Sequence, residues 1–378
     1  MSKVSMELKE EIKEKEKRLQ KYMITKKLEG VILSRGNNWA WITGGRNERI
    51  VYTTEVSFMS LVITKDLKKY CIATNIETKR IEEEDLGDIG YEVLSYPWYE
   101  EYRREAIMAE IADGGNFASD VEFGNNIGKL DGDFNELRFS LTENEIRKYK
   151  QIGEWCREAI EGTAISIEKG MTEQEVQGIA MGKLGKFGLF PDAIMVGSDE
   201  RIFSFRHPLT TDKKIDKYAM ILTCSSKWGL VVAMTRLVHL GKLPDELNYK
   251  MKKVTEIEAK LIANSNPDKS FADITKLMAQ SYSKAGYPGM WELHYQGGPI
   301  GYNVREYDWF PGKENVQRFY NNQAVAWNPT ITGVKSEDTF ISRNGNIEFI
   351  SFNRDTEWPV FEYKINGYEI PRPGILIK

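Results

Sequence analysis

Apolar residues in the first third of the chain form short runs that alternate with amphipathic segments. Short runs bounded by turn residues are typical of strands, and apolar residues three or four positions apart are typical of helices. Within residues 28–45, Gly36-Asn37-Asn38 predicts a turn between two strands. We therefore expect an α/β domain at the N-terminus. Strands are predicted over residues 28–45, 59–66, 68–75 and 91–100, and helices over 76–87 and 104–114.

A different pattern begins at Thr142, where Thr142-Glu143-Asn144-Glu145 has the S/T-x-x-E form of a helix capping box. The order of elements after it predicts a sheet with helices packed on one side. We expect two domains, covering residues 1–135 and 140–378. In the second, helices are predicted over residues 142–169, 172–187, 244–264 and 271–285, and strands over 194–208, 218–226, 229–241, 294–306 and 323–342.

Composition excludes several classes of protein. A balance of 52 basic against 56 acidic residues gives a net charge of −4, which offers no global field for nucleic acid. The charged N-terminus lacks the apolar core of a signal peptide, and no run reaches the ~18 apolar residues of a membrane span. We therefore expect a cytoplasmic protein with no membrane partner. The 3 cysteines are widely spaced, which favours reduced thiols over disulfides or a cysteine zinc site.

Imidazole chemistry is confined to three histidines, His207, His239 and His294. The proline after His207 favours an extended loop, where a functional and a structural role are both open. His239 follows an apolar strand and is expected to be structural. His294 precedes the glycine-rich segment 296–302, in which the backbone could approach a ligand closely or simply turn tightly.

Other polar groups gather near the predicted strand ends. The apolar segment 223–241 keeps Arg236 but contains no acidic residue to meet it. Arg305-Glu306, Asn328-Pro329 and Lys335-Ser336-Glu337-Asp338-Thr339 follow further on. Taken singly, each of these groups is explained by a surface salt bridge. They indicate a site only if one fold brings them together.

Five short motifs occur in a fixed order along nearly the whole chain. They are Asn38-Trp39-Ala40-Trp41-Ile42-Thr43-Gly44, Gly170-Met171-Thr172-Glu173, Phe190 to Gly197 with Arg206-His207-Pro208-Leu209-Thr210, Gly229 to Arg236, and Ser336-Glu337-Asp338-Thr339. In this order they resemble the creatinase, prolidase and aminopeptidase P family. The resemblance implies an α/β N-terminal domain followed by an α+β "pita-bread" domain of the creatinase/aminopeptidase type, and a homodimer.

The resemblance also implies a metal site, which this sequence does not keep. Metallopeptidases of the family hold two divalent ions with two Asp, one His and two Glu, and a hydroxide lies between the ions. The matching positions carry Leu222, Ala233, Gly298, Asn328 and Glu337. One carboxylate cannot hold two divalent ions with useful affinity. We therefore expect no catalytic metal and no other cofactor.

Metal-free members of the family, creatinase among them, use a histidine at the position of His207 for acid and base work on a C–N bond. The resemblance thus predicts a metal-independent, creatinase-like hydrolase or lyase that acts on a C–N bond of a small amino-acid-like or peptide-like substrate. Creatinase-like chains have glutamates where this chain has Thr235 and Asn328, so creatine is not the expected substrate. A non-catalytic binding protein and an Xaa-Pro dipeptidase or aminopeptidase are the alternatives.

The predicted site has two catalytic residues. His207 is the general acid and base, and Glu337 orients it or binds a substrate cation. The C-terminal segment 356–378 has apolar residues and prolines that suit an arm, either over a neighbouring subunit or over its own domain. Substrate contacts are predicted for Arg236, His294, Tyr302, Arg305, Glu306 and Asn328.

Overall fold

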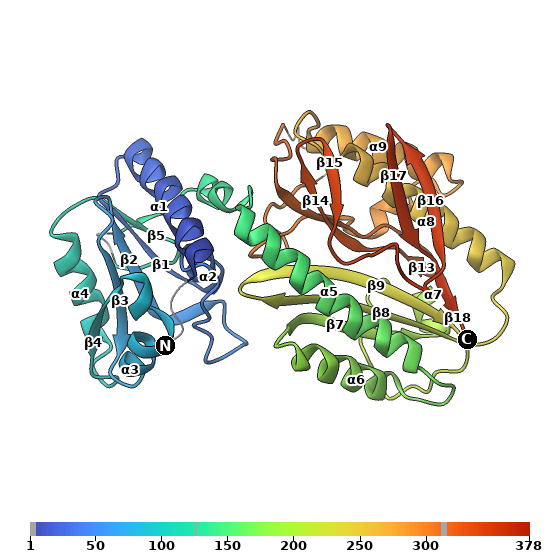
Figure 1. The fold of residues 1–378 in the computed structure, drawn as a ribbon, viewed down its shortest axis with the longest axis horizontal. Coiled ribbons are helices and arrows are strands. Elements are labelled where there is room, and N and C mark those ends of the chain that lie inside the picture. The colour runs from blue at the N-terminus through green and yellow to red at the C-terminus, as the bar shows by residue number, and fades with distance from the viewer. Residues whose placement is uncertain (1–4, 125–126, 311–315) are drawn as a thin grey trace. The chain divides into compact units, whose positions relative to one another are not determined.

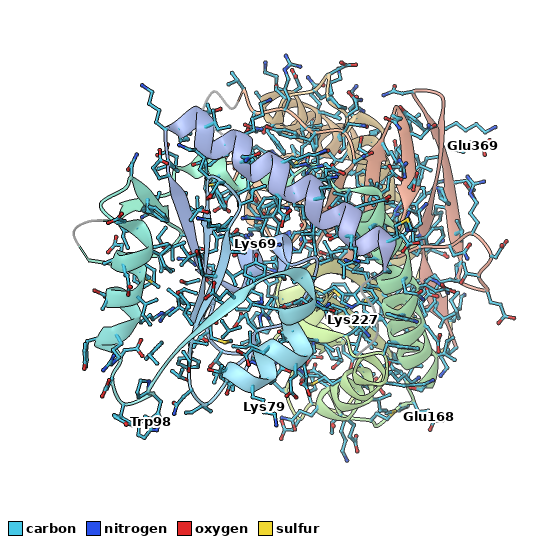
Figure 2. The ribbon with its side chains drawn as sticks, turned by 60° about the vertical axis from the view of Figure 1, so that its left-hand side comes forward. Lys69, Lys79, Trp98, Glu168, Lys227 and Glu369 are labelled. Carbon is cyan, nitrogen blue, oxygen red and sulfur yellow. The ribbon has the colours of Figure 1, made fainter. Side chains whose placement is uncertain are left out.

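The computed structural model describes residues 5–124, 127–310 and 316–378, and the chain divides into two compact units (Figure 1). The first unit comprises Met1–Arg138 and Thr142–Glu145, and the second comprises Phe139–Leu141 and Ile146–Lys378. Charged side chains such as Lys79, Glu168 and Glu369 are exposed on the surface (Figure 2). In the described part of the chain, no helix has the length and apolar character needed to cross a membrane.

The first unit is built on a six-stranded mixed sheet in the order β4-β3-β2-β1-β5-β6 (Figure 1). β1 pairs antiparallel with β2 and parallel with β5. One core cluster joins Ile32, Val62 and Ile72 of the sheet to Met108 of α4. The strands are β1 (Gly30–Arg35), β2 (Val56–Thr64), β3 (Lys69–Thr74), β4 (Glu92–Tyr96), β5 (Phe117–Ser119) and β6 (Gly128–Lys129). The helices are α1 (Met6–Lys26), α2 (Gly36–Ile42), α3 (Thr78–Arg80) and α4 (Tyr102–Ala112).

The prediction of strand, turn and strand over residues 28–45 is wrong in its second half. After β1 the chain forms helix α2. Trp39 and Trp41 of this helix are both fully buried, so its sequence lacks the polar face that marks an amphipathic helix. Asn38 Nδ2 donates a hydrogen bond to Asp120 Oδ2 at 2.8 Å, across 82 residues of sequence. The helix is therefore held by a partner that local sequence does not reveal.

The second unit contains an eight-stranded sheet, in which β10-β11-β14-β9-β8-β7 run side by side, β15 pairs with β14, and β18 pairs with β9. The strands of this sheet are β7 (Phe190–Ser198), β8 (Tyr218–Lys227), β9 (Leu230–His239), β10 (Gly297–Pro299), β11 (Gln323–Trp327), β14 (Asp338–Arg343), β15 (Asn346–Phe349) and β18 (Ile375–Ile377). Two hairpins accompany it, formed by β12 (Thr330–Ile331) with β13 (Val334–Lys335) and by β16 (Val360–Ile365) with β17 (Tyr368–Pro373). The helices are α5 (Glu143–Ser166), α6 (Glu173–Lys186), α7 (Glu200–Ser204), α8 (Asp245–Asn264) and α9 (Phe271–Lys284).

Helices cover both faces of this sheet, whereas the sequence predicted helices on one side. Leu222 and Leu237 share a core cluster with residues of α8 and α9. On the opposite face of β9, Arg236 binds Glu161 of α5 at 2.9 Å. In α5, a Cβ on Gly153 would lie 2.2 Å from the carbonyl oxygen of Ile350, so glycine allows a close approach there. Apolar residues on both faces of β8 and β9 are thus buried, as in a sheet covered by two layers of helices.

Two predicted strands are shorter in the structure. The strand predicted over residues 194–208 ends at Ser198, and helix α7 follows. Asp199 causes this turn: it has a φ of 49°, and its carboxylate accepts hydrogen bonds from the backbone N–H groups of Asp216, Lys217 and Tyr218. The strand predicted over residues 294–306 is reduced to β10, and a loop continues from it.

The C-terminal segment packs on its own unit. β16 and β17 form a hairpin that packs beside α8, and β18 runs parallel to β9. Tyr363 of β16 donates a hydrogen bond from its hydroxyl group to the carbonyl oxygen of Lys252 at 2.8 Å. The segment therefore completes the sheet of its own subunit.

Candidate functional site

Six parts of the second unit bring polar side chains to one place in the sheet. His207 lies in the loop after α7, and His294 follows a 3-10 helix at Met290–Leu293. Arg305 lies in the loop after β10. The remaining side chains come from β9 (Thr235), the end of β11 (Asn328), and the β13–β14 region (Lys335 and Glu337).

The two histidines face each other directly. Their Nε2 atoms are 3.3 Å apart, and their ring centroids are 5.0 Å apart. His207 is exposed, whereas His294 is 8% exposed and its Nδ1 has no hydrogen-bond partner in the described structure. A hydrogen bond between two imidazoles needs one ring nitrogen as donor and the other as acceptor, so the pair holds at least one neutral imidazole.

Cations near the pair favour neutral imidazoles. Burial, together with the nearby Lys335, His207, Arg206 and Arg305, lowers the pKa of His294 from 6.5 to about 2. Burial also lowers the pKa of His207, as does the charge of Lys335, while the charge of Glu337 opposes them. Both histidines are therefore neutral at pH 7, and His207 has the exposure and the protonation state of a general base.

Glu337 is buried, and its carboxylate contacts three side chains. Its Oε2 accepts a hydrogen bond from Thr235 Oγ1 at 2.7 Å and pairs with Lys335 Nζ at 2.9 Å. Its Oε1 accepts a hydrogen bond from Asn328 Nδ2 at 3.3 Å. Glu337 thus acts on His207 through its charge, and no direct contact between the two is found among the described residues.

Arg305 is the accessible cation of the site. Its guanidinium carbon lies 3.9 Å from the ring centroid of Tyr295, and its side chain is 51% exposed. Asp308 pairs with it only at 4.0 Å. A guanidinium stacked on an aromatic ring keeps the donors at its edge available for a ligand.

The structure gives no support to the prediction that Arg236 binds substrate. Its side chain is fully buried on the face of β9 opposite Thr235, where it binds Glu161 and Asp338. It also donates hydrogen bonds to the carbonyl oxygens of Thr235 and Ser351. The acids missing from the apolar strands thus come from α5 and β14, and they leave no donor of Arg236 for a substrate.

Tyr302 and Glu306 are placed in the interior of the loop that carries Arg305. They are 4% and 5% exposed, and Glu306 Oε1 accepts a hydrogen bond from the backbone N–H of Tyr302 at 2.7 Å. The substrate contacts predicted for these two residues stay predictions. In the structure, their contacts shape the loop.

Lys335 is the site residue that the sequence analysis missed. It is 3% exposed, and it is the charged group with the largest effect on the pKa of each of His207 and His294. Its position two residues before Glu337 suggested a surface ion pair. Burial of both side chains distinguishes this ion pair from a weak surface pair. The sequence does not indicate this burial, because the segment is polar.

The donor atoms of the site do not fit a dinuclear metal centre. Leu222 pairs with Thr235 across the two strands, and Cys224 pairs with Ala233, so the two positions expected to carry Asp lie on the face that bears Thr235 but are apolar. Among residues 5–124, 127–310 and 316–378, no group of three or more His, Cys, Asp and Glu side chains is arranged to hold a metal ion. The carboxylate of Glu337, moreover, is already neutralised by Lys335.

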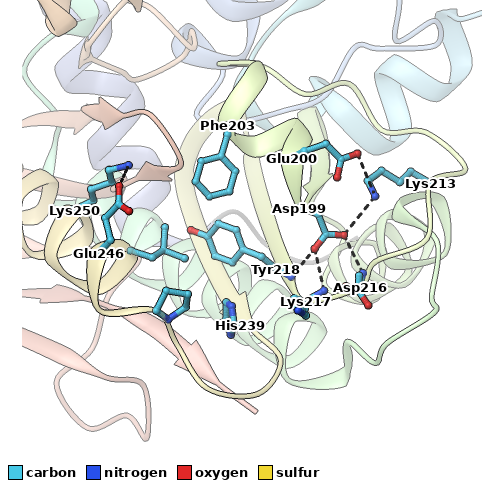
Figure 3. A pocket seen from close by; sticks show the side chains of 12 residues that line it. Asp199, Glu200, Phe203, Lys213, Asp216, Lys217, Tyr218, His239, Glu246 and Lys250 are labelled. Atoms are coloured by element: carbon cyan, nitrogen blue, oxygen red, sulfur yellow. Dashed lines mark hydrogen bonds and ion pairs between the residues drawn. The ribbon is translucent and has the colours of Figure 1, made fainter.

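Two cavities among the described residues of the second unit are each lined by a histidine. One of about 350 Å³ adjoins the histidine pair and is lined by His294 and by Trp291, Tyr295 and Trp309. The other, of about 700 Å³, lies between α7 and the start of α8 (Figure 3). His239 lines this second cavity, and its Nδ1 contacts the carbonyl oxygen of Gly241 at 3.1 Å. Of these two cavities, the first adjoins the predicted site residues.

Comparisons with known proteins place the chain in a family. Residues 147–344, more than half of the chain, match the model of metallopeptidase family M24, and residues 16–128 match the creatinase/prolidase N-terminal domain. An uncharacterized peptidase of Staphylococcus epidermidis is 23% identical over 241 residues, which are 59% of this chain and 65% of that protein. The chain thus spans about 65% of the length of this curated relative.

Solved structures share the fold at low identity. A prolidase from Thermococcus sibiricus has a TM-score of 0.75 and 19% identity, with 94% of this chain and 99% of that chain covered. An Xaa-Pro dipeptidase from Bacillus anthracis has a TM-score of 0.73 and 16% identity, with 91% and 99% covered. Aminopeptidase P from E. coli has a TM-score of 0.71 and 13% identity, with 93% and 96% covered. The chain therefore belongs to metallopeptidase family M24, with an N-terminal domain of the creatinase/prolidase type and a pita-bread C-terminal domain.

Proposed function

We propose that the protein is a metal-independent hydrolase that cleaves a C–N bond of a small amino-acid-like or peptide-like substrate, with His207 as general base and acid. The observation that carries this proposal is the contact of 3.3 Å between His207 and His294 beside a carboxylate that Lys335 already neutralises. A dinuclear site needs carboxylates at this place, and the chain supplies a neutral imidazole pair instead.

The reaction begins with a water molecule at the exposed His207. His207 takes a proton from this water as its oxygen attacks the carbon of the C–N bond. The same proton then passes from His207 to the leaving nitrogen when the C–N bond breaks. A general acid–base group of this kind contributes about 10²–10⁴-fold, so the substrate must also be held in position.

Arg305 and the aromatic cavity supply that positioning. A substrate carboxylate would bind the exposed guanidinium edge of Arg305, which Tyr295 holds in place by stacking. The adjoining cavity of about 350 Å³ has room for a small side chain between Trp291 and Trp309. His294 keeps His207 oriented through the contact between their Nε2 atoms.

A second candidate function is that of an Xaa-Pro peptidase. It is favoured by the solved prolidases and the Xaa-Pro dipeptidase that share this fold. Such an enzyme would need a set of metal ligands, which the described residues of this chain do not reproduce. A binding protein without activity is the remaining alternative.

Elemental analysis separates these candidates when it is combined with activity assays. The protein is soaked in Mn²⁺, Co²⁺ or Zn²⁺, dialysed, and assayed on small C–N compounds and Xaa-Pro dipeptides with and without a chelator. Turnover of a C–N compound that survives chelation and is lost in His207→Ala supports the proposal. Two equivalents of retained metal, with chelator-sensitive cleavage of Xaa-Pro, would instead establish the peptidase. Turnover that persists in folded His207→Ala refutes the role of His207.

A further inference from the structure

The ammonium group of Lys335 is buried, and it has more N–H donors than partners in the described structure. Lys335 is 3% exposed and pairs with Glu337 at 2.9 Å. An ammonium group carries three N–H donors, and no second partner of Lys335 Nζ occurs within the described structure. Buried donors are nearly always satisfied by the protein, by water or by a ligand. Two donors of this buried cation therefore remain available to a bound molecule.

Glu337 holds Lys335 in one position. The carboxylate of Glu337 is itself fixed by Thr235 Oγ1 at 2.7 Å and by Asn328 Nδ2 at 3.3 Å. Thr235 lies in β9 and Asn328 follows β11, so the carboxylate is tied to two strands of one sheet. Through Glu337, the ammonium group of Lys335 is thus held against two strands of the sheet. A group that binds a reacting atom must be held in a fixed position in this way.

Lys335 lies in the β12–β13 hairpin, which contacts the loop that carries His207. Arg206, the neighbour of His207, donates a hydrogen bond to Thr332 Oγ1 at 3.3 Å and lines a small cavity together with Lys335. The charge of Lys335 lowers the pKa of both His207 and His294, and among charged groups it has the largest effect on each. A cation at this place disfavours a further cation and favours an anion. The same part of the fold would hold the metal ions of a metallopeptidase, which polarise the scissile carbonyl group. In this protein, the positive charge at this place is the ammonium group of Lys335, two residues before Glu337.

We propose that Lys335 is a catalytic residue whose ammonium group binds the oxygen that becomes negatively charged when water attacks the substrate. This inference rests on the proposed function. Attack by water on a carbonyl or amidino carbon forms a bond from the water oxygen and places an electron pair on the carbonyl oxygen or the amidino nitrogen. Lys335 donates a hydrogen bond to that atom without giving up its proton. When the electron pair returns, the C–N bond breaks, and the leaving nitrogen takes the proton that His207 carries.

The position of Lys335 explains how the family's reaction class could continue without metal. A preorganised donor at a developing negative charge is usually among the largest contributions to catalysis, and removing one costs about 10²–10³-fold in kcat. A fixed and buried ammonium group meets this requirement. In this proposal, the positive charge of Lys335 stabilises the developing negative charge. It does so in a site where four of the five expected metal ligands are replaced.

Methylphosphonate tests the proposal without a known substrate. It is a tetrahedral anion that resembles the charged state formed after attack by water. Binding is measured by calorimetry and by NMR of the histidine imidazoles, since the chain has only three histidines and two of them form the site. We expect methylphosphonate to shift the resonances of His207 and His294 and to leave those of His239 unchanged.

Two variants at the buried pair provide the decisive comparison. Glu337→Gln removes the carboxylate and keeps the cation, so binding of methylphosphonate should be kept or strengthened. The double variant Lys335→Met with Glu337→Gln removes both charges, which avoids an unpaired buried carboxylate and favours folding. Its affinity should fall about 10- to 100-fold, as expected for the loss of a charge-assisted hydrogen bond.

Further variants complete the test. Lys335→Arg keeps a cation and should retain more affinity than the double variant. Lys213→Met, at a lysine that pairs with Asp199 at 3.4 Å outside the site, should bind like the native protein. Equal affinity of the double variant and Glu337→Gln, or no binding to the native protein, overturns the role of Lys335. Failure of the proposed function is recognised separately, by turnover that persists in His207→Ala.

Discussion

Replacing Arg236 by Met tests the assignment of this residue to the core. The substitution keeps an unbranched side chain but removes a guanidinium that is fully buried. Glu161, at 2.9 Å, loses its buried partner, while Asp338 keeps Arg372 at 2.6 Å. Removing one partner of a buried ion pair costs about 3–5 kcal/mol. In a unit of this size each kcal/mol lowers Tm by about 2–4 °C, so we expect Tm to fall by about 6–20 °C.

Differential scanning calorimetry measures this change, and Arg157→Met is the matched control. Arg157 pairs with the same Glu161 at 3.2 Å, but its side chain is 21% exposed, so its loss should cost no more than about 1 kcal/mol. An Arg236→Met protein as stable as the Arg157→Met control would refute the reasoning. If that stable variant had also lost substrate binding, Arg236 would return as a substrate residue.

Three further predictions concern charge and pH. Burial and the charge of Asp338 raise the pKa of Glu258 from 4.5 to about 7 in the folded state, and Arg372 opposes this. The folded state therefore binds this proton more tightly, and the free energy of unfolding falls as pH rises from about 4.5 to about 7. Glu258→Gln should flatten that dependence in urea denaturation at pH 5, 6, 7 and 8; an unchanged slope contradicts the assignment. Because the pKa of His207 lies below 6.5, turnover should be constant above pH 7 and fall in acid with a midpoint below 6.5; a midpoint above 7 would exclude neutral His207 as the base. Arg305→Gln removes a positive charge that lowers the pKa of both His207 and His294, so both values should rise in NMR titrations, whereas Arg354→Gln, at a side chain of similar exposure, should leave them unchanged.

Local sequence was sufficient for most helices. The capping box predicted at Thr142 is present, since Thr142 N donates to Glu145 Oε2 at 2.6 Å and Glu145 N donates to Thr142 Oγ1 at 3.3 Å. Thr172 and Glu175 form a second one at the start of α6. The predicted helices at 244–264 and 271–285 agree with α8 and α9. These elements depend on caps and on a spacing of apolar residues that both lie within one segment.

Helices without such a local pattern were missed. In α2 the two tryptophans are fully buried, and the helix end is anchored by Asp120 far along the chain. In α7 only five residues are helical, and the turn before them depends on hydrogen bonds from residues 216–218 to Asp199. Local propensity cannot predict either helix, because the stabilising partner is distant in sequence.

The sequence by itself determined the family, through five motifs in order, and it predicted that most residues expected to bind metal are replaced. It also limited imidazole chemistry to three residues, of which His207 and His294 meet in the site. Only the tertiary structure decided the roles of the charged residues. Arg236 is saturated by acids 75 and 102 residues away, and Lys335 is buried against Glu337. A charge becomes structural or catalytic according to its burial and its partners, and both are set by long-range packing of the sheet and its helices.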